Sequence, residues 1–250
     1  MRNLFTPRAR KLIIFILACF IIGSILISQI STPDPDDARE EKEDNNLILH
    51  LFEIGGVAVF IGAVIHALRH WEKREVMIFF LSCFLYALLF EDLNIQMSGD
   101  YSYNKEAWMM VHNTMLVIVL GWCAIVYCIV QTIESNPEAR KWNPLEKGLV
   151  AAILALTIDI GIDATAFAYG LWYWKEGYFF GVPVVNFVGW FGAVFWFVFG
   201  TEILRKRGQG QRWGQGKEMA VRVGAIFPEY IGLLLFVGLS LGFLQALGIL

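Results

Sequence analysis

The chain of 250 residues is 57% hydrophobic and only 17% charged, and its mean hydropathy is +0.55. Soluble globular domains carry about 25% charged residues, so this composition excludes an ordinary soluble protein and indicates an integral membrane protein. The formal net charge of -3 is small, but it hides a strong separation of charge along the chain.

Seven apolar stretches are long enough to cross about 30 Å of hydrocarbon as helices. They lie at 12–30, 47–69, 76–95, 107–133, 147–172, 184–204 and 220–249. They are far longer than the strands of a membrane β-barrel, and they lack the alternation of polar and apolar residues that such strands show. The sequence therefore predicts an all-α, polytopic membrane helix bundle of about seven transmembrane helices.

The first stretch divides the chain into two predicted parts. Residues 1–46 are expected to form an N-terminal transmembrane helix and an acidic outer loop, and residues 47–250 a six-helix membrane bundle that holds the candidate site. The basic leader RNLFTPRARK before an apolar run also fits a signal peptide. The run ends in SILISQIS without a small-x-small cleavage pair, which favours a retained helix.

The distribution of Lys and Arg predicts the orientation in the membrane. With the N-terminus inside, sixteen of the twenty Lys and Arg residues fall in inner segments, and only Arg39, Lys42, Lys105 and Lys175 fall outside. Because basic residues concentrate on the inner side of membrane proteins, we expect a multi-pass protein of the cell membrane with its C-terminus outside. The basic loop RKRGQGQRWGQGK has the same explanation, so no nucleic-acid partner is predicted.

Ionisable side chains inside the spans are the next signal, because a charge at the bilayer centre costs about 2.5–3.5 kcal/mol and usually serves a function. At about 1.5 Å per residue, Asp163 lies about 13 Å below the outer end of its predicted helix, Glu53 about 9 Å, His112 about 8 Å and Glu91 about 6 Å. Four helices thus place an acid or a histidine at similar depth. The pattern predicts a shared polar pocket near the outer leaflet.

The segment LLFEDLNI, residues 88–95, places Glu91, Asp92 and Asn94 where the third predicted helix leaves the hydrocarbon. Asn186 joins them from the sixth helix, just beyond Pro183, a residue that suits the start of a helix. We expect these side chains to contribute to the polar pocket. The alternative, which stays open, is that Asp92 and Asn94 only mark the end of the helix in the headgroup region.

Asp159 and Asp163 are four residues apart and share one face of the fifth predicted helix. Two carboxylates so close in a low dielectric cannot both ionise cheaply, so one is expected to keep its proton, as a general acid must. A pair of helix-to-helix hydrogen bonds is the alternative. A metal cluster of these acids with Glu53, Glu91 and His112 is not predicted, because the E-x-x-H signature of di-iron bundles is absent.

The segment GLWYWKEGYFFGVPVVNFVGW is dense in aromatic residues around a very short outer connection. Trp and Tyr are routine in the interfacial belts of membrane proteins. The same rings would also suit a long apolar substrate, and their faces would stabilise a cation. The candidate substrate-contacting residues are Trp172, Trp174, Tyr178, Phe180 and Trp190.

Two motifs resemble the carotenoid biosynthesis protein family of integral membrane carotenoid hydratases, which includes bisanhydrobacterioruberin hydratase. They are FEDLNI at 90–95, and GYFFGVPVVNFVGW at 177–190 preceded by an Asp-bearing helix and GLWYW. The resemblance implies an enzyme that adds water across the terminal 1,2 double bond of an acyclic carotenoid to give a tertiary alcohol. It implies no cofactor, a long apolar carotenoid or isoprenoid as substrate, membrane lipid as surroundings, and other carotenoid pathway enzymes as partners.

For this chemistry we expect Asp163 or Asp159 to donate the proton to the alkene. Glu91, or Asp92 together with His112, is expected to orient and deprotonate the water. The other polar candidates, expected to hold that water or to line the pocket, are Asn186, Asn113, Asn94 and Glu53.

A membrane transporter or lipid-handling protein, whose intramembrane acids bind a proton or a cation, is the competing functional class. It predicts pH-driven flux with no change in the mass of the substrate. A retinal-binding protein is excluded, because the seventh predicted helix has no Lys after Lys217 to form a Schiff base.

Overall fold

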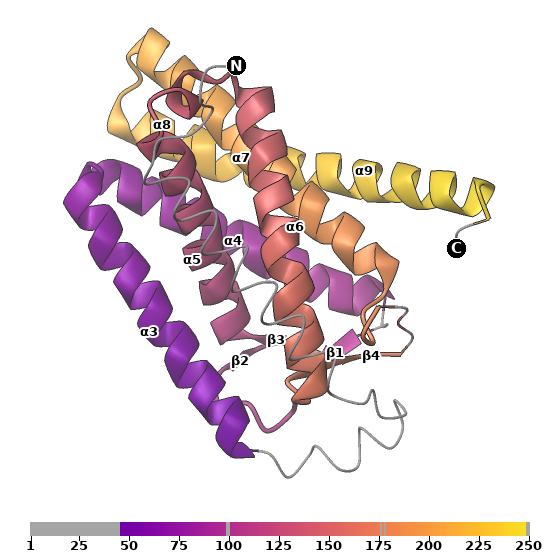
Figure 1. Cartoon of the computed structure of the whole chain (residues 1–250). Coiled ribbons are helices and arrows are strands. Elements are labelled where there is room, and N and C mark those ends of the chain that lie inside the picture. The colour runs from indigo at the N-terminus through magenta and orange to yellow at the C-terminus, as the bar shows by residue number, and fades with distance from the viewer. Residues whose placement is uncertain (1–45, 99–100, 176, 178, 249–250) are drawn as a thin grey trace.

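The computed structural model describes residues 46–98, 101–175, 177 and 179–248 (Figure 1). The predicted first helix at 12–30, nearly all of the predicted 1–46 part and the candidate residue Tyr178 lie outside this range. For the described part, the structure is a bundle of long helices with a few short strands at one end (Figure 1).

The long helices agree with the predicted membrane bundle. They are α3 (Asn46–His70), α4 (Lys73–Ser98), α5 (Leu116–Ser135), α6 (Pro144–Ala168), α7 (Val184–Gln211) and α9 (Ile226–Ala246), with the shorter α8 (Gln215–Gly224) leading into α9. Within the described residues, six helical segments are long and apolar enough to cross a membrane, the last running from Gln215 to Ala246. The helical, multi-pass membrane architecture expected for 47–250 is therefore confirmed.

The described residues include two short antiparallel strand pairs, and β2, β3 and the first residue of β4 fall where the sequence predicts helix. Strand β1 (Tyr101–Tyr103) pairs with β4 (Trp172–Trp174), and Tyr101 lies opposite Trp174. Strands β2 (Met110–Val111) and β3 (Thr114–Met115) form a hairpin. The helix predicted from residue 107 is wrong up to Met115, and the helix predicted to reach 172 ends at Ala168, because the apolar runs continue into extended chain.

Local sequence explains why α6 and α7 begin where they do. At the start of α6, the Asn143 side chain accepts from the backbone N–H of Glu146 at 3.0 Å, and the Glu146 side chain accepts from the Asn143 N–H at 2.8 Å. This reciprocal cap, followed by Pro144 at the first helical position, is a strong start signal. Pro183 precedes α7 in the same way, so Asn186 does lie in the first turn of that helix, as predicted.

The two ends of the bundle differ in chemistry. The basic end carries α8, the link between α3 and α4, and the 3₁₀ turn η1 (Ala139–Lys141) between α5 and α6. The strand end carries β1 to β4 and lies at the opposite end of the bundle (Figure 1). Helix α9 begins beside α7 and α8 and extends to the side of the bundle (Figure 1). The predicted inner and outer loops thus separate onto opposite ends of the bundle.

Ion pairs join the helices at the basic end. Lys147 on α6, whose side chain is only 2% exposed, bonds Glu202 on α7 at 3.0 Å and also bonds Glu134 on α5. Arg222 on α8 bonds both carboxylate oxygens of Glu75 on α4, at 2.6 and 2.7 Å. Lys147 and Arg222 therefore each pair with an opposite charge from another helix, as burial in a membrane bundle requires.

Candidate functional site

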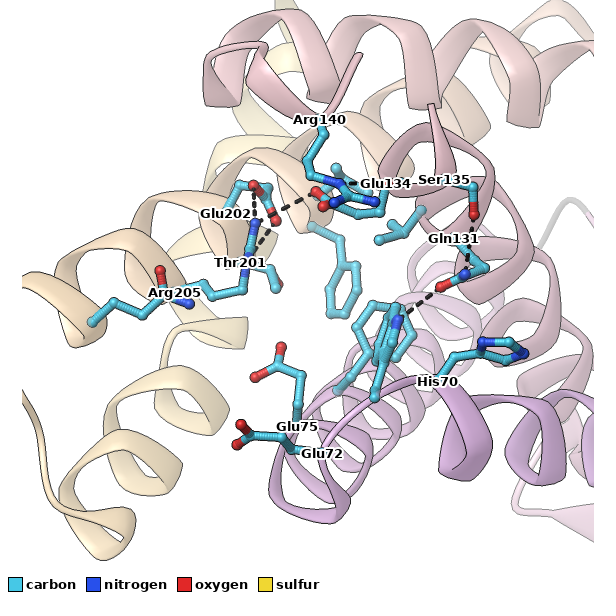
Figure 2. Close-up of a pocket in the computed structure, with 16 residues that line it drawn as sticks. His70, Glu72, Glu75, Gln131, Glu134, Ser135, Arg140, Thr201, Glu202 and Arg205 are labelled. Carbon is cyan, nitrogen blue, oxygen red and sulfur yellow. Dashed lines mark hydrogen bonds and ion pairs between the residues drawn. The ribbon is translucent and has the colours of Figure 1, made fainter. Parts of the chain in front are cut away.

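One cavity in the described part of the bundle lies at its basic end. It has a volume of about 690 Å³ and lies between α4, α5 and α7 (Figure 2). Figure 2 shows Glu134, Glu202 and Arg205 linked around it by hydrogen bonds and ion pairs; Arg205 Nε, for example, bonds Glu202 Oε1 at 2.9 Å. These three charges pair with one another, so this part of the cavity wall links α5 to α7.

The second cavity lies toward the strand end and has a volume of about 250 Å³. Its walls come mostly from apolar and aromatic side chains with a few polar groups among them, which is the usual character of a site for a small or apolar ligand. The sequence-predicted residues that line it are Glu91, Asn94, Asp163, Trp172, Trp174, Asn186 and Trp190. Residues from α4, β4, α6 and α7 are thus brought together as predicted.

Glu91 forms one polar group of this cavity. Its carboxylate is buried and accepts hydrogen bonds from the hydroxyl of Tyr101 at 2.5 Å, the hydroxyl of Tyr103 at 2.6 Å and the indole N–H of Trp122 at 2.7 Å. Burial, with the Glu91 charge as the next cause, raises the pKa of both tyrosines well above the usual value. The two hydroxyls therefore keep their protons and act as donors to the carboxylate.

Asp159, Asp163 and Asn186 form the opposite polar group. The two carboxyls are buried on one face of α6. The Asn186 side-chain amide on α7 donates to Oδ2 of Asp159 at 3.3 Å and also to Oδ2 of Asp163. Oδ1 of Asp159 is buried and receives no hydrogen bond from the described donors. One amide thus binds two adjacent acids, and Asp163 faces the cavity while Asp159 lies behind it.

Aromatic rings form much of the remaining wall. Trp122 and Trp190 stack with ring centroids 3.9 Å apart and planes 18° from parallel. At the strand end, the pairing of β1 with β4 sets Tyr103 edge-on to Trp172, with centroids 6.0 Å apart. An apolar chain inside the cavity would therefore contact ring faces close to both acidic groups.

Asp92, His112 and Asn113 lie outside the cavity lining of the described residues. His112 and Asn113 form the turn of the β2–β3 hairpin, and the His112 side chain is 62% exposed. His112 Nδ1 lies 2.8 Å from Asp92 Oδ1, and the Asn113 backbone N–H donates to the same oxygen at 3.3 Å. The predicted depth of His112 in a helix is wrong, because the hairpin replaces the first turns of that helix.

Glu53, which the sequence placed in the polar pocket, does not line the cavity. Its buried carboxylate accepts from the backbone N–H groups of Trp108 at 3.2 Å and Met109 at 3.0 Å, and it lies 3.1 Å from His50 Nδ1. Glu53 therefore fixes the loop before β2. Phe180 lies in a turn with φ of +49° and is not among the described residues that line the cavity.

Three side chains that contact Glu91 were not predicted from the sequence. Tyr101 and Tyr103 alternate in YSY, and Trp172 and Trp174 alternate in WYW, so each pair projects from one face of an extended segment. This alternation was the available signal for β1 and β4. Trp122 had no such signal, because a tryptophan within an apolar helix reads as packing.

Most of the sequence matches a known protein family. Residues 48–249 match the family described as carotenoid biosynthesis protein. No curated protein and no solved structure matches the chain significantly. The match covers every described helix and both polar groups of the cavity, so the chain belongs to the carotenoid biosynthesis protein family.

Proposed function

We propose that this protein is a membrane hydratase that adds water across the terminal 1,2 double bond of an acyclic carotenoid. Family membership supports a role in carotenoid biosynthesis. The observation that carries the finer proposal is the cavity itself, which presents Asp163 and Glu91 to one apolar, aromatic space. Alkene hydration needs such a pair, because one group must supply a proton and another must accept one.

The Asp159 and Asp163 pair supplies the proton in this proposal. Two adjacent buried carboxyls share a single proton more readily than they carry two charges. Asn186 donates to both acids, which holds the pair in place. Asp163 faces the cavity and delivers the proton to C2 of the terminal double bond, which leaves a tertiary cation at C1.

The cavity walls then stabilise that cation. The faces of Trp190 and Trp122 attract a positive charge by about 0.5–2 kcal/mol for each favourable contact. The Glu91 carboxylate adds a fixed negative charge, and its three hydrogen bonds hold it in place. Such charges, placed before the reaction, need no rearrangement as the cation forms.

Water completes the reaction at C1. In our proposal Glu91 orients one water molecule. The water oxygen bonds to the cation at C1 while the Glu91 carboxylate accepts a proton from that water, and the product is a tertiary alcohol. One C–H bond, one C–O bond and the O–H bond at Glu91 form, while the π bond, one O–H bond of water and the O–H bond at Asp163 break. The formal oxidation of C1 and reduction of C2 cancel, so no oxidant or reductant is needed. The exposed Asp92 and His112 pair is left without a chemical role.

The test is pigment analysis in a host that accumulates lycopene or elongated acyclic carotenoids. Expression of the wild-type chain should give a more polar pigment, heavier by one or two waters by mass spectrometry. Glu91→Gln should lose that pigment, since the variant keeps the size of the side chain but removes the base. His112→Gln is the control on the exposed pair and should retain it.

Unchanged pigments in every acyclic host, with the wild-type chain verified in the membrane, would contradict the hydratase proposal. Flux driven by a pH gradient in proteoliposomes would then favour the transporter class.

A further inference from the structure

We infer that the Tyr101 hydroxyl returns the proton from Glu91 to the Asp159 and Asp163 pair after each turnover. This inference rests on the proposed hydratase function and assigns a catalytic role to a residue outside the acids that perform the addition. It concerns the step that resets the site for the next substrate.

The need for a reset follows from the reaction itself. Each hydration leaves Glu91 with the proton taken from water and leaves the Asp pair one proton short. Both groups are buried: Glu91 is 5% exposed, Asp163 3% and Asp159 0%. Exchange with bulk water is hindered at such positions, so an internal route between the two groups shortens the cycle.

Tyr101 has the contacts that this route requires. Its hydroxyl lies 2.5 Å from Glu91 Oε2, and it lines the same cavity as Asp163. A tyrosine hydroxyl both donates and accepts hydrogen bonds. It can therefore accept the Glu91 proton while its own proton moves to Asp163, directly or through one cavity water.

The other two partners of Glu91 are poorer candidates. Trp122 donates through its indole N–H and has no lone pair with which to accept a proton. Tyr103 also lines the cavity, but it is buried and packs edge-on against Trp172, whereas Tyr101 is half-buried and so more open to a water in the cavity. Its hydroxyl binds the same Glu91 oxygen as Tyr101, at 2.6 Å.

The balance of the step involves only protons. The O–H bond at Glu91 breaks as an O–H bond to Tyr101 forms, and the original Tyr101 O–H bond breaks as one forms at Asp163. Tyr101 ends neutral, as it began. The negative charge moves from Asp163 back to Glu91, which restores the starting state.

Tyr101→Phe and Tyr103→Phe make a matched pair for the test, because each removes one hydroxyl from the same Glu91 oxygen. With purified enzyme and an acyclic carotenoid in detergent, both variants should form their first equivalent of product at similar rates, because each loses one of the hydrogen bonds that hold Glu91. In Tyr101→Phe, later turnovers should then be slower than its first by about 100-fold, the scale of a lost acid–base group. A larger solvent isotope effect in D₂O should appear in the slow phase only.

Tyr103→Phe and the wild type should show no such slow phase after the first equivalent. The relay is overturned if Tyr101→Phe turns over continuously at nearly the wild-type rate, or if its first and later turnovers slow equally. If the wild-type enzyme hydrates none of the substrates, the proposed function itself fails, which is a different result from an active wild type with matched variants.

Discussion

Asn186 on α7 donates its side-chain amide to Asp163 on α6, and the same amide reaches Asp159 one turn away. The site therefore treats the two aspartates as one unit. Replacing a single member should differ from replacing both, because the remaining acid keeps its amide partner and its burial.

Asp163→Asn should lower kcat by about 100- to 10,000-fold, since the acid that faces the cavity is lost. Asp159→Asn should lower it less, because Asp163 remains. The measurement is product formation by liquid chromatography with the enzyme amount normalised. Full activity in the Asp159→Asn, Asp163→Asn double variant would remove the aspartate pair from the mechanism.

Trp190→Leu should lower kcat by about fivefold while leaving KM within a few-fold. The Trp190 ring stacks on Trp122 at 3.9 Å and lines the cavity, so its loss removes about 1 kcal/mol of attraction for the cation. Trp190→Phe keeps a ring face and should recover most of the rate. Equal rates for the Leu and Phe variants would argue against stabilisation by the ring.

Lys147→Met should destabilise the protein by about 1–3 kcal/mol, because it removes the buried cation that bridges Glu134 and Glu202 and leaves only Arg205, among the described residues, to pair with them. Lys141→Met is the control: its partner Glu138 lies at 3.4 Å and both side chains are about 70% exposed, so the change should cost less than about 1 kcal/mol. Thermal unfolding in one detergent compares the two. Similar melting temperatures would refute a stabilising role for Lys147.

Gly56→Ala and Gly55→Ala should act in opposite directions. A Cβ at Gly56 would overlap Cγ2 of the buried Val117 on α5, whereas one at Gly55 would meet nothing within 4 Å. Overpacking costs about 1–3 kcal/mol, and Ala in place of Gly favours an open helix position by about 1 kcal/mol. Thermal unfolding should rank Gly55→Ala above the wild type and Gly56→Ala below it.

Helix positions in this chain were largely predictable, because hydropathy and length are enough when every span must satisfy its own backbone. The predicted 47–69 and 184–204 both fall inside observed helices, Asn46–His70 and Val184–Gln211. The failure at 107–115 has a physical reason: the apolar residues AWMMV stand just before the apolar span that begins at Leu116, so the two were read as one helix. The polar pair His112 and Asn113 was the sequence sign of a two-residue hairpin turn. In the structure these two residues connect β2 to β3, and His112 has a φ of +56°.

The candidate site was predictable to the level of its acids. Glu91, Asp163 and Asn186 do share one cavity, because intramembrane polar groups gather where they can satisfy one another. Glu53 is equally buried, yet it binds loop N–H groups. Depth along a helix does not tell which side of the helix a residue faces, so the sequence could not separate these two fates.

The pairing of β1 with β4 sets an order on how this site assembles. The two strands are separated along the chain by α5 and α6, so β1 can pair with β4 only after both helices have been made. Such distant contacts form late, since the loop that they close is long. A nascent chain that ends after β1 already holds Tyr101 and Tyr103 close to Glu91 in sequence, but the wall made by Trp172 and Trp174, and Asp163 opposite Glu91, come later.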